Sequence, residues 1–321
     1  MSTEKKIIAV IGATGIQGGS IVKTLLADSK MSSEWAIRGI TRDASKDICK
    51  NLASQGVEII TWQANLDSKD SLLAAFEGVY AIFAVTNYFE TLVQEIEVQQ
   101  GMNLADAALE SGVQHFIWSS LPNVTELTNG ALKNVYHFDS KAKVEAYIRT
   151  TALPATYLMP GFYMNNLPGQ VFKQSPPDNA WTLGLPVPST APVPLFAAIE
   201  DTGKFVKAIL NHRDETLGKR VLAATKYYTL DEMITTFKEV FPEAGETAGF
   251  YKTPHEEYLA WFTDAGLPDY VALELLEMIM LLDEGGYFGG DSLEWSHSLL
   301  DEPLTTWEEY IKSSEIFANL K

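Results

Sequence analysis

Apolar residues recur along the first half of the chain in short runs that are rich in β-branched side chains. Such runs are typical of strands buried on both faces of a sheet. Between them, apolar residues recur at helical spacing. This alternation predicts a Rossmann-type, doubly wound α/β fold with a mostly parallel sheet and helices on both faces. The expected strands occupy residues 6–11, 35–42, 57–62, 80–85, 115–120 and 155–160.

The pattern changes after residue 160. Residues 161–194 are rich in proline, aromatic residues and asparagine, and cannot continue the alternation. A helix over 199–210 and a strand over 221–225 are expected to return to the sheet. We therefore predict a nucleotide-binding domain and a second, smaller, largely helical domain. The first is formed by residues 1–160 with 196–226, and the second by residues 161–195 and 227–321.

Several helices have recognisable limits or faces. One is expected over residues 91–110. A strongly apolar helix over 270–282 is expected to pack on the first domain and cover its cleft. Thr305 is expected to cap the last helix. The glycine-rich stretch 285–290 predicts either a mobile lid or an ordinary connection.

Charge and cysteine content narrow the functional classes. The 321 residues carry a formal net charge of −18, which argues against direct nucleic-acid binding. The charge serves solubility or attracts a basic protein partner, such as a regulator. A single cysteine, Cys49, suits a reducing compartment, and no metal-ligand spacing is present. No apolar run has transmembrane length. We expect no membrane association and a cytoplasmic location, with the nucleus as a second compartment.

A glycine-rich turn joins the first strand to the first helix. Gly12 permits a tight turn, Gly15 lets the backbone approach a pyrophosphate, and Gly18 lets the helix pack close to the strand. The helix start then presents N–H groups to phosphate. Thr14 and Gln17 in the same turn are further candidates for cofactor contacts. The spacing G-x-x-G-x-x-G differs from the usual G-x-G-x-x-G, but its strand–turn–helix context predicts a dinucleotide site.

The end of the second strand predicts which dinucleotide binds. This position typically carries an acid in NAD enzymes. Here Arg42 and Lys46 can pair the 2′-phosphate of NADP, and Arg can do so bidentately. Asp43 lies between them and could instead hold an unmodified ribose. We predict that the cofactor is NADP(H), with NAD bound more weakly.

Polar residues also follow other predicted strands. Asn65 comes after the third strand, in position to flank an adenine. Thr86 and Asn87 follow the fourth strand, and two serines end the fifth. Carboxyl ends of parallel strands border the ligand crevice in such sheets. Thr86 and Asn87 are therefore candidate cofactor-binding residues, with a plain turn as the alternative.

Together these segments resemble the NmrA-like family, an atypical branch of the short-chain dehydrogenases. The resemblance is carried by GATGIQGG, Thr41-Arg42, Thr86-Asn87-Tyr88, HFDSK and TTWEEYI. It covers nearly the whole chain and is closest to NADP-sensing regulatory members. It implies that Arg42 and Lys46 hold the 2′-phosphate and that Lys141 contacts the nicotinamide ribose.

The chain departs from the enzymes of that superfamily at one position. They use Y-x-x-x-K on one helix face, where the tyrosine moves the proton. Here the spacing gives His137-x-x-x-Lys141, and Tyr136 points about 100° away around the helix. This favours a protein that has lost catalysis and kept binding. His137 as a replacement acid or base is the alternative.

Residues 138–144 are also similar to the isoflavone-reductase-like enzymes, which use a lone lysine as general base. On that resemblance Lys141 would be catalytic. Our leading hypothesis is an NADP(H)-binding sensor that regulates a partner protein in transcriptional or metabolic control. The alternative is an NADPH-dependent oxidoreductase whose substrate is a small carbonyl or enone.

Overall fold

The computed structural model describes residues 5–61, 66–175 and 178–321. Within these residues, seven parallel strands form a central sheet in the order β11-β6-β5-β4-β1-β2-β3. The strands are β1 (Lys6–Ile11), β2 (Trp35–Thr41), β3 (Glu58–Thr61), β4 (Ala81–Ala84), β5 (His115–Ser119), β6 (Ala155–Pro160) and β11 (Arg220–Ala223). From β1 the chain first adds strands on one side of the sheet (β2, β3) and then, from β4 on, adds them on the other side. In sheets of this kind a crevice opens at the carboxyl ends of the two strands where the direction changes, here β1 and β4.

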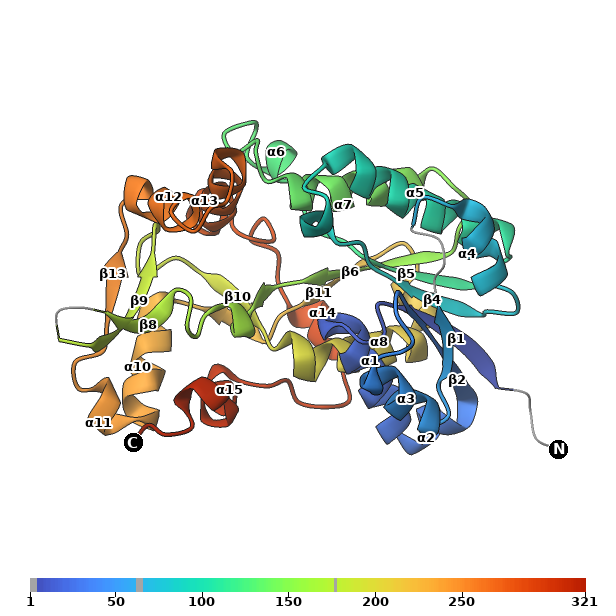
Figure 1. Ribbon diagram of the computed structural model, residues 1–321, viewed down its shortest axis with the longest axis horizontal. Helices are drawn as coiled ribbons and strands as arrows, with labels where there is room; N and C mark the ends of the chain where they lie inside the picture. Colours follow the sequence, from blue (N-terminus) through green and yellow to red (C-terminus); the bar gives the residue numbers. More distant parts are fainter. Residues whose placement is uncertain (1–4, 62–65, 176–177) are drawn as a thin grey trace.

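Helices cover both faces of the sheet, as the apolar pattern predicted (Figure 1). One layer holds α4 (Lys69–Ala75), α5 (Gln94–Glu110) and α7 (Tyr136–Arg149), and the other holds α1 (Ile16–Ala27), α2 (Ser29–Glu34), α3 (Asp47–Ser54) and α8 (Ala198–Asn211). Gly101 of α5 lies against Val144 of α7, and Gly203 of α8 lies against Thr24 of α1. A Cβ at either glycine would collide with its neighbour, so glycine lets both helix pairs pack closely.

The rest of the chain adds two small sheets to the expected helices. In the described residues, the first has the order β12-β10-β7 and the second β13-β9-β8. Their strands are β7 (Phe162–Tyr163), β8 (Phe172–Ser175), β9 (Ala180–Leu185), β10 (Val193–Phe196), β12 (Lys226–Tyr228) and β13 (Gly249–Lys252). The sequence predicted none of these six strands; in β13, for example, the residues alternate neither in polarity nor in burial.

The longer helices of this part are α10 (Leu230–Val240), α12 (His255–Thr263), α13 (Asp269–Glu284) and α15 (Trp307–Ser313). Shorter helical elements are α6 (Val124–Leu127), α9 (Arg213–Thr216), α11 (Pro242–Gly245), α14 (Glu294–Ser298), η1 (Tyr88–Glu90), η2 (Met164–Asn166) and η3 (Glu315–Phe317). No helix in the described ranges is long and apolar enough to cross a membrane. The exact division of the chain into two domains stays a prediction.

Two helix starts differ from the expected ones. Thr306, not Thr305, caps α15: its hydroxyl accepts from the Glu309 N–H, and the Glu309 carboxylate accepts from the Thr306 N–H. Thr305 instead donates its N–H and hydroxyl to Asp201, at 2.9 and 3.0 Å. Helix α5 begins at Gln94 rather than residue 91, because η1 and a left-handed Leu92 precede it.

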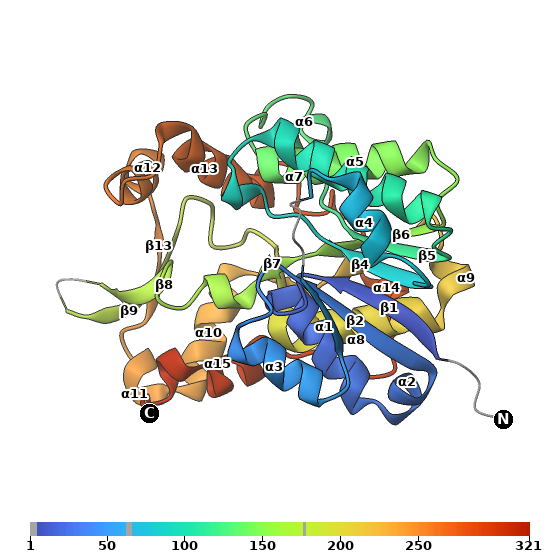
Figure 2. The same cartoon turned by 45° about the vertical axis from the view of Figure 1, so that its right-hand side comes forward.

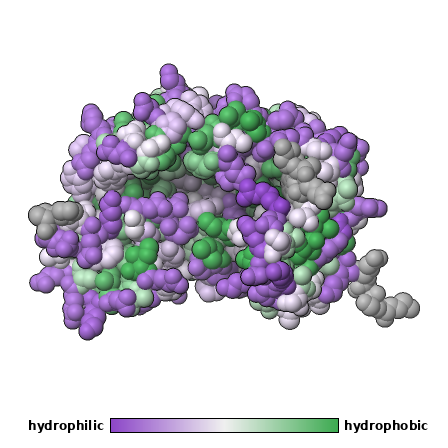
Figure 3. Space-filling model, viewed as in Figure 1, coloured by the Kyte–Doolittle hydropathy of each residue, from purple (hydrophilic) through white to green (hydrophobic). Residues whose placement is uncertain are grey.

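Helix α13 lies over the crevice beside α6 and α7 (Figures 1 and 2). Its residues Leu275 and Met278 line the cavity that opens at the carboxyl ends of β1 and β4. The surface is hollowed at the centre of the face in Figure 3, with hydrophobic residues beside the hollow. The apolar helix predicted over residues 270–282 therefore does cover the cleft.

Candidate functional site

A cavity of about 620 Å³ occupies the crevice between the two parts of the molecule. It brings together most of the residues that the sequence singled out. Those lining it are Gly12, Thr14, Gly15, Gln17, Gly18, Arg42, Thr86, Asn87, His137 and Lys141. Lys46, an exposed residue at the start of α3, is not among them. Asn65 lies outside the described residues.

The glycine turn is compact and open toward the cavity. Gly12 has a φ of +68°, and the Gly15 N–H donates to its carbonyl at 2.8 Å. A Cβ at Gly18 would collide with that carbonyl, so glycine is needed for the helix to start here. Gly15 caps α1 without a side chain and is exposed. The first N–H groups of a helix lack intrahelical partners. The turn thus fits the pyrophosphate of a dinucleotide.

Gln17 connects the two parts of the cleft. Its amide nitrogen donates to the Tyr163 hydroxyl at 2.8 Å, and its amide oxygen accepts from the Ser119 hydroxyl at 3.0 Å. Burial raises the pKa of the Tyr163 phenol, which keeps that group protonated. Gln17 therefore fixes β7 against the turn, in addition to lining the cavity.

Arg42 lies at one end of the cleft, beside an acid that the sequence did not single out. Its Nη1 is 2.5 Å from the Glu90 carboxylate, which also accepts from the Asn87 amide at 3.1 Å. Asp43 is turned back on its own loop, where it accepts from the Ser45 N–H and hydroxyl. These bonds lower the pKa of Asp43.

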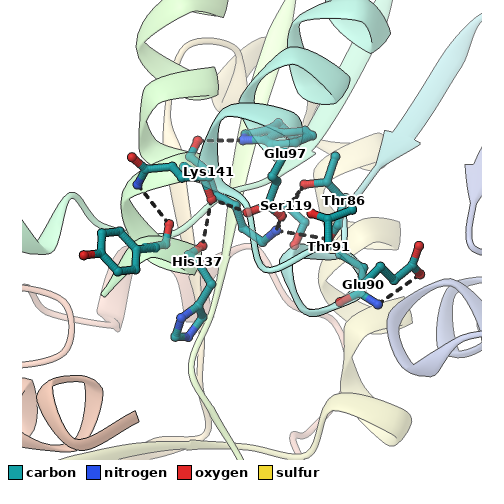
Figure 4. A network of polar contacts seen from close by, with 12 residues as sticks. Thr86, Glu90, Thr91, Glu97, Ser119, His137 and Lys141 are labelled. Carbon is teal, nitrogen blue, oxygen red and sulfur yellow. Dashed lines mark hydrogen bonds and ion pairs between the residues drawn. The ribbon is translucent and has the colours of Figure 1, made fainter. Parts of the chain in front are cut away.

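Lys141 lies in a buried polar network (Figure 4). Its ammonium forms an ion pair with Glu97 of α5 and donates to the carbonyl and hydroxyl of Thr86 at 3.0 and 3.1 Å. Glu97 is 1% exposed and also accepts from Thr86 and Ser140. The Lys141 side chain is thus held by Glu97 and Thr86, which disfavours its use as a lone-lysine base.

His137 has a separate carboxylate partner. Its Nδ1 is 2.6 Å from Glu274 of α13, and its backbone N–H donates to the same oxygen at 2.9 Å. Glu274 is fully buried. The carboxylate accepts from Nδ1 when that nitrogen carries the ring proton, and His137 lines the cavity. Figure 4 shows the ring turned away from Lys141 and Glu97.

The surroundings of His137 are apolar. The rings of Tyr88, Phe89 and Phe138 have centroids 6.1, 5.1 and 4.8 Å from the imidazole. Burial, followed by the charge of Glu274, raises the pKa of the Tyr88 phenol, which therefore stays protonated. Leu275, Met278 and Tyr287 also line the cavity, and the Tyr287 ring lies 5.3 Å from the Phe138 ring.

Sequence reasoning missed the acids Glu97, Glu274 and Glu90. Glu97 shares the buried stripe of α5 with Gly101, Leu104 and Ala108, and Glu274 lies on the buried stripe of α13. An acid within an apolar stripe must be paired, so both could have been found. Glu90 lies in an exposed turn and gave no such signal.

Comparison with known proteins agrees with this architecture. The profile of the NmrA-like family matches residues 4–311. The NmrA-like family domain-containing oxidoreductase lnaB of Aspergillus flavus is 29% identical over 309 residues, covering 92% of this chain and 89% of that protein. The NmrA-like family domain-containing oxidoreductase hkm9 of Aspergillus hancockii is also 29% identical, covering 92% and 88%.

Solved structures share the fold. NmrA, a negative transcriptional regulator, in complex with NADP superposes with a TM-score of 0.78 at 21% identity, covering 96% of this chain and 94% of that one. The triphenylmethane reductase of Citrobacter sp. complexed with NADP(H) gives 0.73 at 23% identity, covering 95% and 98%. From the profile match over nearly its whole length, the chain belongs to the NmrA-like family.

Proposed function

We propose that this protein binds NADP(H) in the cleft and acts as an oxidoreductase on a small, largely apolar carbonyl or enone. The observation that carries the proposal is the His137–Glu274 pair, whose histidine lines the cavity among the rings of Tyr88, Phe89 and Phe138. The sequence favoured a sensor because no replacement for the missing tyrosine was evident. The buried carboxylate partner makes His137 such a replacement.

The side chains have distinct roles in this proposal. The turn at Gly12 to Gly18 would hold the pyrophosphate, and Arg42 would hold the 2′-phosphate. NADPH, when bound, would supply the hydride that reduces the substrate. His137 would deliver the proton that completes the reduction to a substrate oxygen or carbon, while Glu274, 2.6 Å from Nδ1, would orient the ring. The aromatic and aliphatic lining excludes water from the reacting atoms.

The names of relatives support oxidoreductase chemistry in general terms. The matched proteins of Aspergillus flavus and Aspergillus hancockii are named oxidoreductases. The fold also occurs in a structure described as a transcriptional regulator, so fold alone does not choose between the two roles.

The second candidate is the NADP(H) sensor that regulates a protein partner. It is favoured by the Lys141 ammonium, which is already engaged by Glu97 and Thr86. In this role Lys141 orients the ribose and has no part in proton transfer.

Binding and turnover measured on the same preparation separate the candidates. Calorimetric titration with NADP and NADPH comes first, followed by NADPH oxidation against a panel of small carbonyls and enones. We expect binding and steady oxidation of NADPH with at least one apolar substrate. Binding without turnover across the panel would favour the sensor, and absence of binding would contradict both candidates.

A further inference from the structure

We infer that Glu90 determines how strongly this cleft prefers NADP over NAD. The inference rests on the proposed dinucleotide binding and adds a residue to it. Glu90 is the acid that accepts from an unmodified adenosine ribose, and it competes with a 2′-phosphate for Arg42. The cleft can then take both cofactors, and Glu90 sets their relative affinities.

The sheet brings Glu90 and Arg42 together from different strands. Arg42 directly follows β2, and Glu90 lies in η1 after β4; both strands pair with β1. Their carboxyl ends therefore meet at one edge of the cleft. There the two side chains approach to 2.5 Å, and both line the cavity.

Glu90 takes the place of an acid that the end of β2 lacks. An acid at that position typically binds the ribose hydroxyls of NAD. Asp43, which follows β2, accepts from the Ser45 hydroxyl and N–H through its Oδ1, at 2.6 and 2.9 Å, and does not line the cavity. The carboxylate next to Arg42 at this edge comes instead from Glu90. Figure 4 shows it on the far side of Thr86 from His137, away from the proposed proton donor.

The backbone around Glu90 is fixed in an uncommon conformation. The N–H groups of Thr91 and Leu92 both donate to the Tyr88 carbonyl, at 3.2 and 2.8 Å. Leu92 has a φ of +57°, in the left-handed region that non-glycine residues rarely adopt. Such conformations persist where surrounding structure enforces them, often at ligand sites. The hydrogen bond from the Asn87 side-chain amide to the Glu90 carboxylate further restricts the position of that carboxylate.

Charge explains why Glu90 separates the two cofactors. The ribose 2′-OH of NAD is neutral and can donate to the carboxylate while the Arg42–Glu90 pair stays intact. The 2′-phosphate of NADP is an anion that competes with Glu90 for the ion pair with Arg42 and is repelled by the Glu90 carboxylate. Arg42 therefore favours NADP and Glu90 opposes it.

The test compares NAD and NADP affinities by calorimetry at one ionic strength in wild type, Glu90→Gln and Glu95→Gln. Glu95 is a nearby exposed acid of α5 and gives the same change in net charge. We expect the ratio of NADP to NAD affinity to rise about tenfold in Glu90→Gln and to change less than about twofold in Glu95→Gln.

An unchanged or lower ratio in Glu90→Gln, with both nucleotides still bound, would overturn this role while leaving the proposed function standing. An equal rise in both variants would also overturn it, because the effect would then be one of net charge. If the wild-type protein binds neither nucleotide, that result contradicts both the proposed function and the role of Glu90.

Discussion

At the scale of single residues, buried acids organise the cleft. Glu97 and Glu274 are 1% and 0% exposed, and each fixes one cationic or titratable side chain of α7. Burying a charge is costly unless a partner with good geometry compensates it. Each acid therefore holds a different side chain of α7 in place: Glu97 holds Lys141, and Glu274 holds His137.

Removing one partner of the Glu97–Lys141 pair should destabilise the fold. Glu97→Gln leaves the Lys141 ammonium buried without a carboxylate, so we expect the free energy of unfolding in urea to fall by about 3 kcal/mol. The double variant Glu97→Gln/Lys141→Gln should lose less than the sum of the two single variants. Additive losses would contradict direct coupling of the pair.

Arg42 and Lys46 should differ as partners of the 2′-phosphate. Arg42 lines the cavity and Lys46 does not. A charge-assisted hydrogen bond contributes about 1.5–3 kcal/mol, so Arg42→Ala should weaken NADP binding by about tenfold or more. Lys46→Ala is the matched control and should have a much smaller effect in the same calorimetric titration. Equal losses would restore the sequence-based expectation that both cations bind the phosphate.

At the scale of elements, the start of α1 places Gly15 on the cavity lining and Gly19 off it. Gly15→Val places a branched side chain at the exposed cap, so we expect dinucleotide affinity to fall by at least about tenfold in a folded protein. At Gly19 a Cβ would meet only ordinary contact, with Ala13 O at 3.7 Å. Gly19→Ala should therefore bind like wild type. Circular dichroism establishes folding, and unchanged affinity in Gly15→Val would contradict the phosphate-loop assignment.

Elements with a strong local pattern could be predicted, and those that depend on distant partners could not. The strands β1, β4 and β5 contain the apolar runs 7–11, 81–84 and 116–118, and their parallel pairing follows from the helices between them. In contrast, β7 spans two residues and pairs with β10, more than thirty residues later in the chain. No local pattern marks such a strand.

At the scale of the whole molecule, the sequence predicted the site residues at the strand ends better than it predicted the partners of α7. The glycine turn, Arg42 and Thr86 all belong to carboxyl ends of parallel strands, which topology alone brings together. The partners of α7 lie 44 and 137 residues away in the chain, so only tertiary packing brings them to it. The sequence predicted that helix α13 covers the cleft, but it did not predict that Glu274 of this helix contacts His137.

The most direct test of the account is the effect of His137→Phe on NADPH oxidation and NADPH binding in one preparation. Tyr136→Phe is the matched control, since the Tyr136 hydroxyl donates to Asn134 at 3.0 Å and does not line the cavity. We predict that His137→Phe binds NADPH nearly as wild type does but oxidises it about 10²–10⁴ times more slowly, the usual share of a general acid. Tyr136→Phe should keep the wild-type rate. Oxidation at the wild-type rate by His137→Phe would contradict the assignment of His137 as the proton donor.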